Sequence, residues 1–208
     1  MKLRLAVLLL LLMPVLAMAA EPVAGVDYVE FANGKPFAPV KGKVEVAEVF
    51  GYSCIHCFHL ESTIGPWKKK QPASVKFTLV PAAFGGYWTT YARAFFAAQK
   101  LGVLERSHAE VFKAVHVDGN LPVQNVTNQE IGAYYGSFGV TPKAFVASME
   151  SPAVNALLER SRQFAMTAGV EGTPTLIVAG KYRVTARSPE DALRTVDYLV
   201  ARERVARK

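Results

Sequence analysis

The chain has 208 residues, of which 51% are apolar and 20% charged, the balance of a globular protein that can bury a core. Its formal charge is +7, but the basic residues are scattered, and no basic stripe with interleaved aromatic side chains is present. Without a nucleic-acid-binding motif, this charge indicates a solvated basic surface and excludes nucleic acid as an expected partner.

The first 19 residues have the pattern of a secretory signal peptide. Lys2 and Arg4 precede an apolar run, residues 5–16, which is too short to span a bilayer comfortably. The run ends in Ala17-Met18-Ala19, an A-x-A cleavage site. We expect cleavage after Ala19, which leaves residues 20–208 with a charge of +5 as one exported domain; a retained amino-terminal anchor is the alternative.

The first part of the exported chain reads as strand, strand, helix, strand. Short strands are predicted at residues 28–31 and 44–50 from their apolar and β-branched content. A turn then leads into a helix from Cys54 to about Lys70, whose last turn carries three lysines that suit a helix carboxyl end. The next strand is predicted at residues 75–80, stopped by Pro81.

The middle of the chain has helical periodicity, and we expect it to form a helical insertion at about residues 85–169. Apolar residues recur at helical spacing from Trp88 to Phe96 and again in a stripe that runs from Leu104 through His108 to Val115. A capping box at 127–130 starts a helix that is expected to continue to Gly139, and two N-cap-proline pairs, at Thr141 and Ser151, start further helices. The helical block cannot bury these stripes alone, so we expect it to pack on itself and against the face that carries the two cysteines. His108 and His116 are expected to be surface or helix-packing residues.

The last part returns to strands and ends in a helix. Strands are predicted at residues 175–178 and 181–184, joined by a hairpin turn at Ala179-Gly180. Ser188 caps a final helix. This order of elements implies the α+β class with a central mixed sheet.

Cys54 and Cys57 are the only cysteines, and their Cys-x-x-Cys spacing favours redox chemistry. Cys54 stands at the expected start of a helix, where the orphan N–H groups and the positive end of the helix dipole stabilise a thiolate. A protonated His56 would add positive charge nearby. A stabilised thiolate favours the reduced pair and so makes the disulfide a stronger oxidant. Cys57, one turn deeper, is the expected resolving thiol.

Three other interpretations of the pair remain open. A structural disulfide across four residues removes little chain entropy and is a weak staple. A metal site could combine both cysteines with His56 and His59, although structural zinc sites often draw on two separated pairs. The third is a buried pair with no chemistry.

Two further positions have a functional and an ordinary interpretation. Glu48 lies within an apolar strand six residues before Cys54, where it is either buried under the cysteines with a raised pKa or exposed to solvent. Thr173-Pro174 precedes a predicted strand, and this proline either marks a turn or forms a cis peptide bond. A cis bond would present the Thr173 backbone to an extended peptide.

These features together resemble the thioredoxin superfamily and, more narrowly, the DsbA family of periplasmic dithiol oxidases. The likeness runs from about Val26 to about Tyr198, and its most specific stretches are residues 48–58 and 169–175, with Gly180-Lys181-Tyr182 after them. It implies a thioredoxin-like fold with an inserted helical domain.

The resemblance also implies a role for each site residue. Cys54 would be the attacking or attacked sulfur, Cys57 the resolving sulfur, and His56 the residue that stabilises the Cys54 thiolate. Glu48 matches the family's buried acid and Glu61 a second charged residue near the site. Pro174 matches the cis-proline opposite the disulfide, and Thr173 the residue that precedes it.

The chain departs from the family pattern at two positions. The commonest dipeptide between the cysteines is Pro-His, whereas this chain has Ile55-His56. The family often pairs its buried acid with a lysine on the following strand, where this chain has Leu79. Glu48 is therefore expected to lack a counter-charge, which would raise its pKa further.

As a function, the resemblance implies a thiol:disulfide oxidoreductase of the periplasm that introduces disulfides into newly exported proteins. Its partners would be folding proteins with free thiols and a quinone-linked membrane reoxidase of the DsbB type. Neither a small-molecule cofactor nor a metal is implied, and a monomer is expected. The alternatives are a disulfide isomerase or reductase of the same fold and, in another class, a thiol-based metal chaperone.

Overall fold

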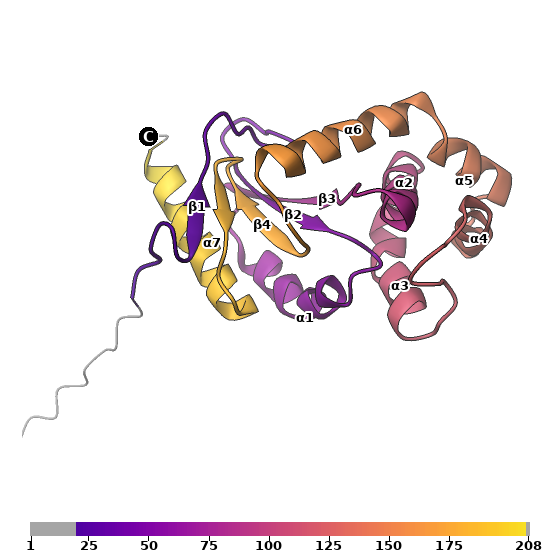
Figure 1. Ribbon diagram of the computed structural model, residues 1–208, viewed down its shortest axis with the longest axis horizontal. Helices are drawn as coiled ribbons and strands as arrows, with labels where there is room; N and C mark the ends of the chain where they lie inside the picture. The colour runs from indigo at the N-terminus through magenta and orange to yellow at the C-terminus, as the bar shows by residue number, and fades with distance from the viewer. Residues whose placement is uncertain (1–19, 207–208) are drawn as a thin grey trace, which may run out of the picture.

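A mixed five-stranded sheet lies at the centre of the computed structural model, which describes residues 20–206 (Figure 1). The predicted signal peptide, residues 1–19, lies outside the described residues. The sheet has the order β1-β5-β4-β2-β3, in which β2 and β3 are parallel and the other neighbours antiparallel. The strands are β1 (Tyr28–Glu30), β2 (Val44–Phe50), β3 (Val75–Pro81), β4 (Thr175–Val178) and β5 (Tyr182–Val184).

Two helices cover one face of this sheet: α1 (Ile55–Lys70) and α7 (Pro189–Val205). Their apolar side chains form one core with Val44 and Val46 of β2 and with Leu176 of β4. Because strand residues alternate between faces, Glu48 lies on the same face as Val44 and Val46, under α1.

The other helices stand between β3 and β4 in the chain and form the predicted insertion. They are α2 (Gly86–Lys100), α3 (Leu104–His116), α4 (Asn128–Tyr134), a 3₁₀ turn (Tyr135–Phe138), α5 (Pro142–Met149) and α6 (Pro152–Thr167). The long helix α6 leads the chain from the far end of the insertion back to the sheet (Figure 1). The α+β class and the thioredoxin-like fold with inserted helices are confirmed.

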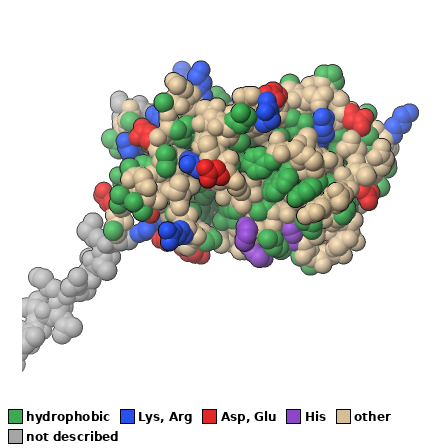
Figure 2. All heavy atoms as spheres, in the orientation of Figure 1, with side chains coloured by type: hydrophobic (Ala, Val, Ile, Leu, Met, Phe, Trp, Pro, Cys, Tyr) green, Lys and Arg blue, Asp and Glu red, His purple; other side chains and the backbone are tan. Residues whose placement is uncertain are grey.

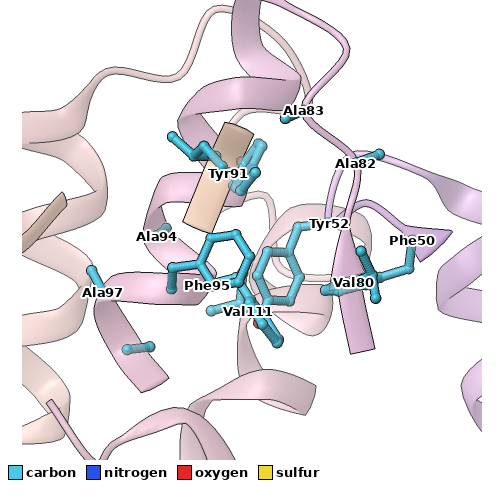
Figure 3. Close-up of a cluster of buried hydrophobic side chains, with 14 of the residues drawn as sticks. Phe50, Tyr52, Val80, Ala82, Ala83, Tyr91, Ala94, Phe95, Ala97 and Val111 are labelled. Carbon is cyan, nitrogen blue, oxygen red and sulfur yellow. The ribbon is translucent and has the colours of Figure 1, made fainter. Parts of the chain in front are cut away.

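The insertion packs against the carboxyl end of β2 through an aromatic cluster (Figure 3). Phe50 and Tyr52 meet edge to face at 5.3 Å between ring centroids, and Phe50 meets Phe95 of α2 at 5.4 Å. Tyr52 also contacts Phe112 of α3 at 5.0 Å. This cluster fixes the insertion beside the turn that leads into α1, as the apolar stripes of the sequence predicted.

Two local predictions need correction. The third strand does not stop before Pro81 but includes it, and this is tolerated because β3 is an edge strand. The helix that begins at the Thr127 capping box does not continue regularly to Gly139: it tightens into a 3₁₀ turn at Tyr135 before Gly139 ends it with φ of 77°.

The predicted hairpin turn is present, and its backbone explains the residues found there. Ala179 and Gly180 have φ values of 53° and 65°, the conformation that a two-residue hairpin turn requires. A Cβ at Gly180 would lie 2.2 Å from the Lys35 backbone, so this position also needs glycine for space.

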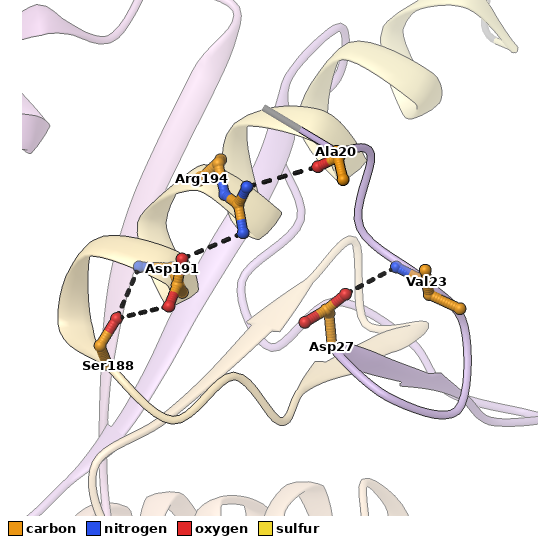
Figure 4. Close-up of polar contacts among 6 residues, drawn as sticks. All are labelled: Ala20, Val23, Asp27, Ser188, Asp191 and Arg194. Carbon is orange, nitrogen blue, oxygen red and sulfur yellow. Dashed lines mark hydrogen bonds and ion pairs between the residues drawn. The ribbon is translucent and has the colours of Figure 1, made fainter. Parts of the chain in front are cut away.

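The start of the described chain lies against α7 (Figure 4). Arg194 donates to the Ala20 carbonyl at 3.3 Å and pairs with Asp191 at 3.0 Å. Ser188 caps the same helix by accepting from the Asp191 N–H. Among residues 20–206, no helix has the length and apolarity needed to cross a membrane.

Glu45, on the other face of β2 from Glu48, anchors the segment before that strand. Its carboxylate is buried and accepts from the backbone N–H groups of Phe37 and Ala38 and from the Thr78 hydroxyl. We expect Glu45→Ala to reduce the free energy of unfolding by roughly 2–4 kcal/mol, because it leaves these donors without an acceptor. Urea unfolding measures this, with Glu21→Ala at an exposed position as the control; equal stability of the two variants would contradict the structural role.

Candidate redox site

The turn between β2 and α1 places Cys54 at the amino end of the helix. Cys54 is the N-cap residue, and its sulfur accepts a hydrogen bond from the Cys57 N–H at 3.3 Å. Both cysteines are free thiols, so the structure describes the reduced pair. Cys57 is fully buried, whereas Cys54 retains 8% of its surface, so only Cys54 is open to a reacting thiol.

The loop before β4 brings a second segment to the same sulfur. The Thr173–Pro174 peptide bond is cis, and the Cys54 thiol donates to the Thr173 carbonyl at 3.3 Å, across 119 positions of sequence. The structure therefore brings together the Cys-x-x-Cys and Thr-Pro segments that the sequence analysis singled out.

The two thiols have opposite acid–base properties. Hydrogen bonds lower the pKa of Cys54 from 9.0 to about 5: the largest comes from the Cys57 side chain, followed by the Thr173 side chain and the backbone N–H groups of Cys57 and His56, and together they outweigh burial. Burial raises the pKa of Cys57 far above its usual range, and the hydrogen bond to Cys54 and the nearby charges of Cys54 and Glu48 add to this. Cys54 is thus a thiolate at neutral pH and Cys57 a thiol.

His56 lies at the surface rather than on the sulfur. Its backbone N–H stabilises the Cys54 thiolate, while its side chain is exposed and lines a groove with His59. The groove has a volume of about 440 Å³ and runs from Pro174 to the loop before α7, where Arg187 lies. Figure 2 shows histidine side chains among hydrophobic ones in the region of α1 and α3. A role for the His56 imidazole stays a prediction.

A second, mostly apolar pocket is lined by Cys54 itself. It has a volume of about 370 Å³ and is lined by Ile55, Phe84 and Trp88, with Glu171 also in its wall. Trp88 fixes the residue before Tyr52 as glycine, because a Cβ at Gly51 would lie 2.3 Å from the indole ring.

Glu48 lies within the sheet under α1, with only 1% of its surface exposed, so the solvent-facing alternative is wrong. Its in-register neighbours are Leu79 on β3 and Leu176 on β4, and its Oε2 atom has no hydrogen-bond partner among the described residues. Burial, reinforced by the charges of Glu61 and Cys54 and opposed by Lys68, raises the pKa of Glu48 from 4.5 to about 8. Glu48 is therefore a neutral acid at pH 7.

Glu61, on the second turn of α1, lies near two positively charged or protonatable side chains. Its carboxylate is 3.8 Å from Lys68 Nζ and 3.6 Å from His108 Nε2. Burial alone would raise the pKa of Glu61, but the contact with His108 and the charge of Lys68 outweigh it, so the pKa falls below 4.5.

The prediction that His108 and His116 are surface or helix-packing residues is confirmed in their packing, but it did not include their contacts with the redox turn. Both lie on the face of α3 that meets the turn before Cys54: His108 Nδ1 is 2.9 Å from Tyr52 Oη, and His116 Nε2 is 2.8 Å from the Tyr52 carbonyl oxygen. The signal was present in the sequence, since His108 interrupts an otherwise apolar helical stripe. What the sequence lacked was the partner of that stripe.

Within residues 20–206, no group of three or more His, Cys, Asp or Glu side chains comes together as a metal site would require. The proposed four-ligand set of Cys54, Cys57, His56 and His59 is thus not assembled in this conformation.

Comparisons with known proteins agree with this site. A family model, the DSBA-like thioredoxin domain, matches residues 59–197. The thiol:disulfide interchange protein DsbA of Pseudomonas aeruginosa is 37% identical over 195 residues, which cover 92% of this chain and 90% of that protein. The protein of the same name from Azotobacter vinelandii is 35% identical over 185 residues, covering 88% of this chain and 85% of that protein.

Solved structures give the same result. The crystal structure of the oxidoreductase DsbA from Xylella fastidiosa matches with a TM-score of 0.87 and 48% identity, covering 89% of this chain and 100% of that one. The crystal structure of Pseudomonas aeruginosa DsbA matches with a TM-score of 0.81 and 36% identity, covering 89% of this chain and 96% of that one. With its Cys54/Cys57 pair and cis-Pro174 assembled as the sequence led us to expect, this chain belongs to the DsbA family of thioredoxin-fold thiol:disulfide oxidoreductases.

Proposed function

We propose that the mature protein acts in the periplasm as a dithiol oxidase that introduces disulfide bonds into newly exported proteins. The single observation that carries this proposal is the position of Cys54 at the amino end of α1, where its sulfur accepts from the Cys57 N–H and its pKa is lowered to about 5. A stable thiolate favours the dithiol, so the Cys54–Cys57 disulfide accepts two electrons readily. The family relationship and the signal-like residues 1–19 support the location.

In this mechanism a substrate thiolate attacks the Cys54 sulfur of the oxidised protein. The Cys54–Cys57 bond breaks, a substrate–Cys54 disulfide forms, and Cys57 leaves as a thiolate that takes up a proton. Glu48, neutral at pH 7, is the proposed source of that proton through the protein interior. A second substrate thiolate then attacks the bound substrate sulfur, which releases the oxidised substrate and the Cys54 thiolate. Two electrons have passed from substrate to protein.

The substrate is proposed to be an unfolded chain, held beside the cis-proline loop. Thr173 and Pro174 line the groove next to Cys54, and an extended segment laid there can bond to the Thr173 backbone. A quinone-linked membrane protein of the DsbB type is proposed to oxidise the dithiol again. His56 and Glu61 are proposed to tune the site, and no bound cofactor is proposed.

The experiment that tests this function is the oxidation of a reduced, unfolded protein that contains two cysteines. The oxidised mature protein should transfer one disulfide per molecule, and Cys54→Ser should transfer none. Efficient reduction of a substrate disulfide by the dithiol form, with poor oxidation of thiols, would instead favour the reductase or isomerase alternative.

The residue between the cysteines that departs from the family pattern gives a further prediction. Ile55 is the first residue of α1, where proline is favoured and no intrahelical N–H bond is lost. We expect Ile55→Pro to fix the N–H groups that face the Cys54 sulfur and to raise the reduction potential by roughly 10–20 mV, equivalent to about 0.5–1 kcal/mol.

The potential can be measured by equilibration with glutathione, and Ile55→Ala is the matched control. Alanine removes the same side-chain bulk but retains the N–H and the free φ angle. An unchanged reduction potential in Ile55→Pro, or an equal shift in Ile55→Pro and Ile55→Ala, would refute an effect of the proline ring on the potential.

A further inference from the structure

His108 occupies an unusual position for a histidine, inside the aromatic cluster that joins the insertion to the redox turn. Its ring lies 5.3 Å from Phe50 and from Phe112, and 5.4 Å from Tyr52, between ring centroids. Only 12% of its side chain is exposed. Packing alone would be served better by an apolar residue, because a buried imidazole must satisfy two polar nitrogens.

The two nitrogens of His108 face different partners. Nδ1 is 2.9 Å from Tyr52 Oη, and Nε2 is 3.6 Å from Glu61 Oε1, longer than a normal hydrogen bond. Nε2 is buried and has no closer partner among the described residues. If Tyr52 donates to Nδ1, the ring proton of a neutral imidazole sits on Nε2 and points at the carboxylate. The opposite tautomer would direct a lone pair at the negative charge.

His116 holds the same tyrosine from its other end. Its Nε2 atom is 2.8 Å from the Tyr52 carbonyl oxygen, and its ring stacks on Phe58 of α1 at 5.4 Å. Helix α3 therefore contacts both the backbone and the hydroxyl of Tyr52, two residues before Cys54. This double contact keeps the His108 ring fixed relative to α1 and Glu61.

We propose that His108 is a positioning residue of the redox centre: its buried Nε2, 3.6 Å from Glu61 Oε1, attracts the carboxylate and limits where it can lie, and the position of that carboxylate sets the electrostatic field at buried Glu48. This inference deepens the proposed function, on which its relevance to thiol chemistry rests. It assigns to the insertion a part in tuning the cysteine pair.

The groups that face Glu48 support this chain of influence. Glu48 lies on the face of β2 that packs against α1, the helix that carries Glu61, Lys68 and Cys57 and that Cys54 caps. The charges that act on Glu48 come from these residues, while β3 and β4 present Leu79 and Leu176 in register. After burial, the charge of Glu61 is the largest influence that raises the pKa of Glu48. Where the Glu61 carboxylate lies therefore matters for Glu48, and His108 is its contact from α3.

The test is a carbon-13 NMR titration of the Glu48 side-chain carboxyl in the reduced mature protein. We expect Glu61→Gln to lower the titration midpoint by about one pH unit, since it removes a like charge. His108→Phe should lower it by about half as much, because the released carboxylate turns toward Lys68 and solvent. His108→Gln should stay near the wild type, because its amide N–H can replace Nε2–H.

The decisive comparison is His108→Phe in the Glu61→Gln background, where it should cause no further shift. Equal shifts with and without Glu61, or no shift in His108→Phe, would overturn the proposal. Tyr52→Phe, which removes only a hydroxyl, gives a second variant if His108→Phe folds poorly. It should lower the titration midpoint of Glu48 when Glu61 is present and leave it unchanged in the Glu61→Gln background. The titration needs no substrate, so a negative result here leaves the oxidase function untouched, and failure of the oxidase assay leaves the titration interpretable.

Discussion

Replacing Cys57 with alanine is expected to trap substrates on the protein as mixed disulfides. When the Cys57→Ala protein carries glutathione on Cys54, a single-cysteine peptide can displace the glutathione and become attached to the Cys54 sulfur. In the wild type, Cys57 lies one helical turn away, with its N–H 3.3 Å from that sulfur, and its thiolate can attack and release the peptide. Because this release is intramolecular, its loss should extend the lifetime of the adduct on the order of 100-fold or more.

Mass spectrometry without reductant follows the adduct over time. Cys54→Ala is the matched control, because it leaves Cys57 as the single cysteine. Cys57 is fully buried and its pKa is raised, so that variant should form almost no adduct. Fast adduct formation on Cys57 would reverse the assignment of the attacked sulfur.

Replacing Glu48 with glutamine is expected to change the pH dependence of stability. The folded protein holds the Glu48 proton up to about pH 8, whereas the ordinary value is 4.5. The stability that this group contributes is complete below pH 4.5 and is lost progressively as the pH rises from 4.5 to about 8, because in this range the unfolded state has released the proton that the folded state still holds. The shift corresponds to roughly 3–5 kcal/mol of unfolding free energy, all of it lost by about pH 8.

The observable is the difference between the wild type and Glu48→Gln in urea unfolding of the reduced proteins from pH 4.5 to 9. The difference is needed because Cys54, with its lowered pKa, contributes an opposite slope between about pH 5 and 9. The free energy of unfolding of Glu48→Gln should rise relative to that of the wild type as the pH increases across this range. Parallel curves would mean that Glu48 is not a neutral buried acid.

Leu79→Lys tests the cause of that shift with a single added charge. Leu79 stands in register with Glu48 on the neighbouring strand, so a lysine there can bring its ammonium group near the carboxyl. The pKa of Glu48 should fall, and the pH-dependent loss of stability should largely disappear. A slope like that of the wild type would show that the absence of a counter-charge at position 79 of β3 does not cause the raised pKa of Glu48.

Much of the redox site could be predicted from the sequence because its determinants are local. The start of a helix at Cys54 and the spacing to Cys57 follow from neighbouring residues. The apolar residues around Glu48 predicted a buried strand, although they could not decide whether the acid itself faced inward. The hairpin at Ala179-Gly180 was likewise predicted by its own residues.

What the sequence could not supply were contacts between elements far apart in the chain. The approach of His108 to Glu61 depends on how α3 packs against α1, and a stripe of apolar positions does not name its partner. The groove likewise draws Arg187 from the loop before α7, which has no motif of its own. The sequence also does not show that β3 is an edge strand, the position in which Pro81 can be part of the strand instead of ending it.

The thiol–disulfide equilibrium of the mature protein with glutathione tests the account most directly. A Cys54 thiolate with a pKa of about 5 stabilises the dithiol, so the reduction potential should lie well above that of thioredoxin, about −270 mV. Cys54→Ser should show no such equilibrium. A potential close to that of thioredoxin would contradict the account and point to a protein that reduces or rearranges disulfides.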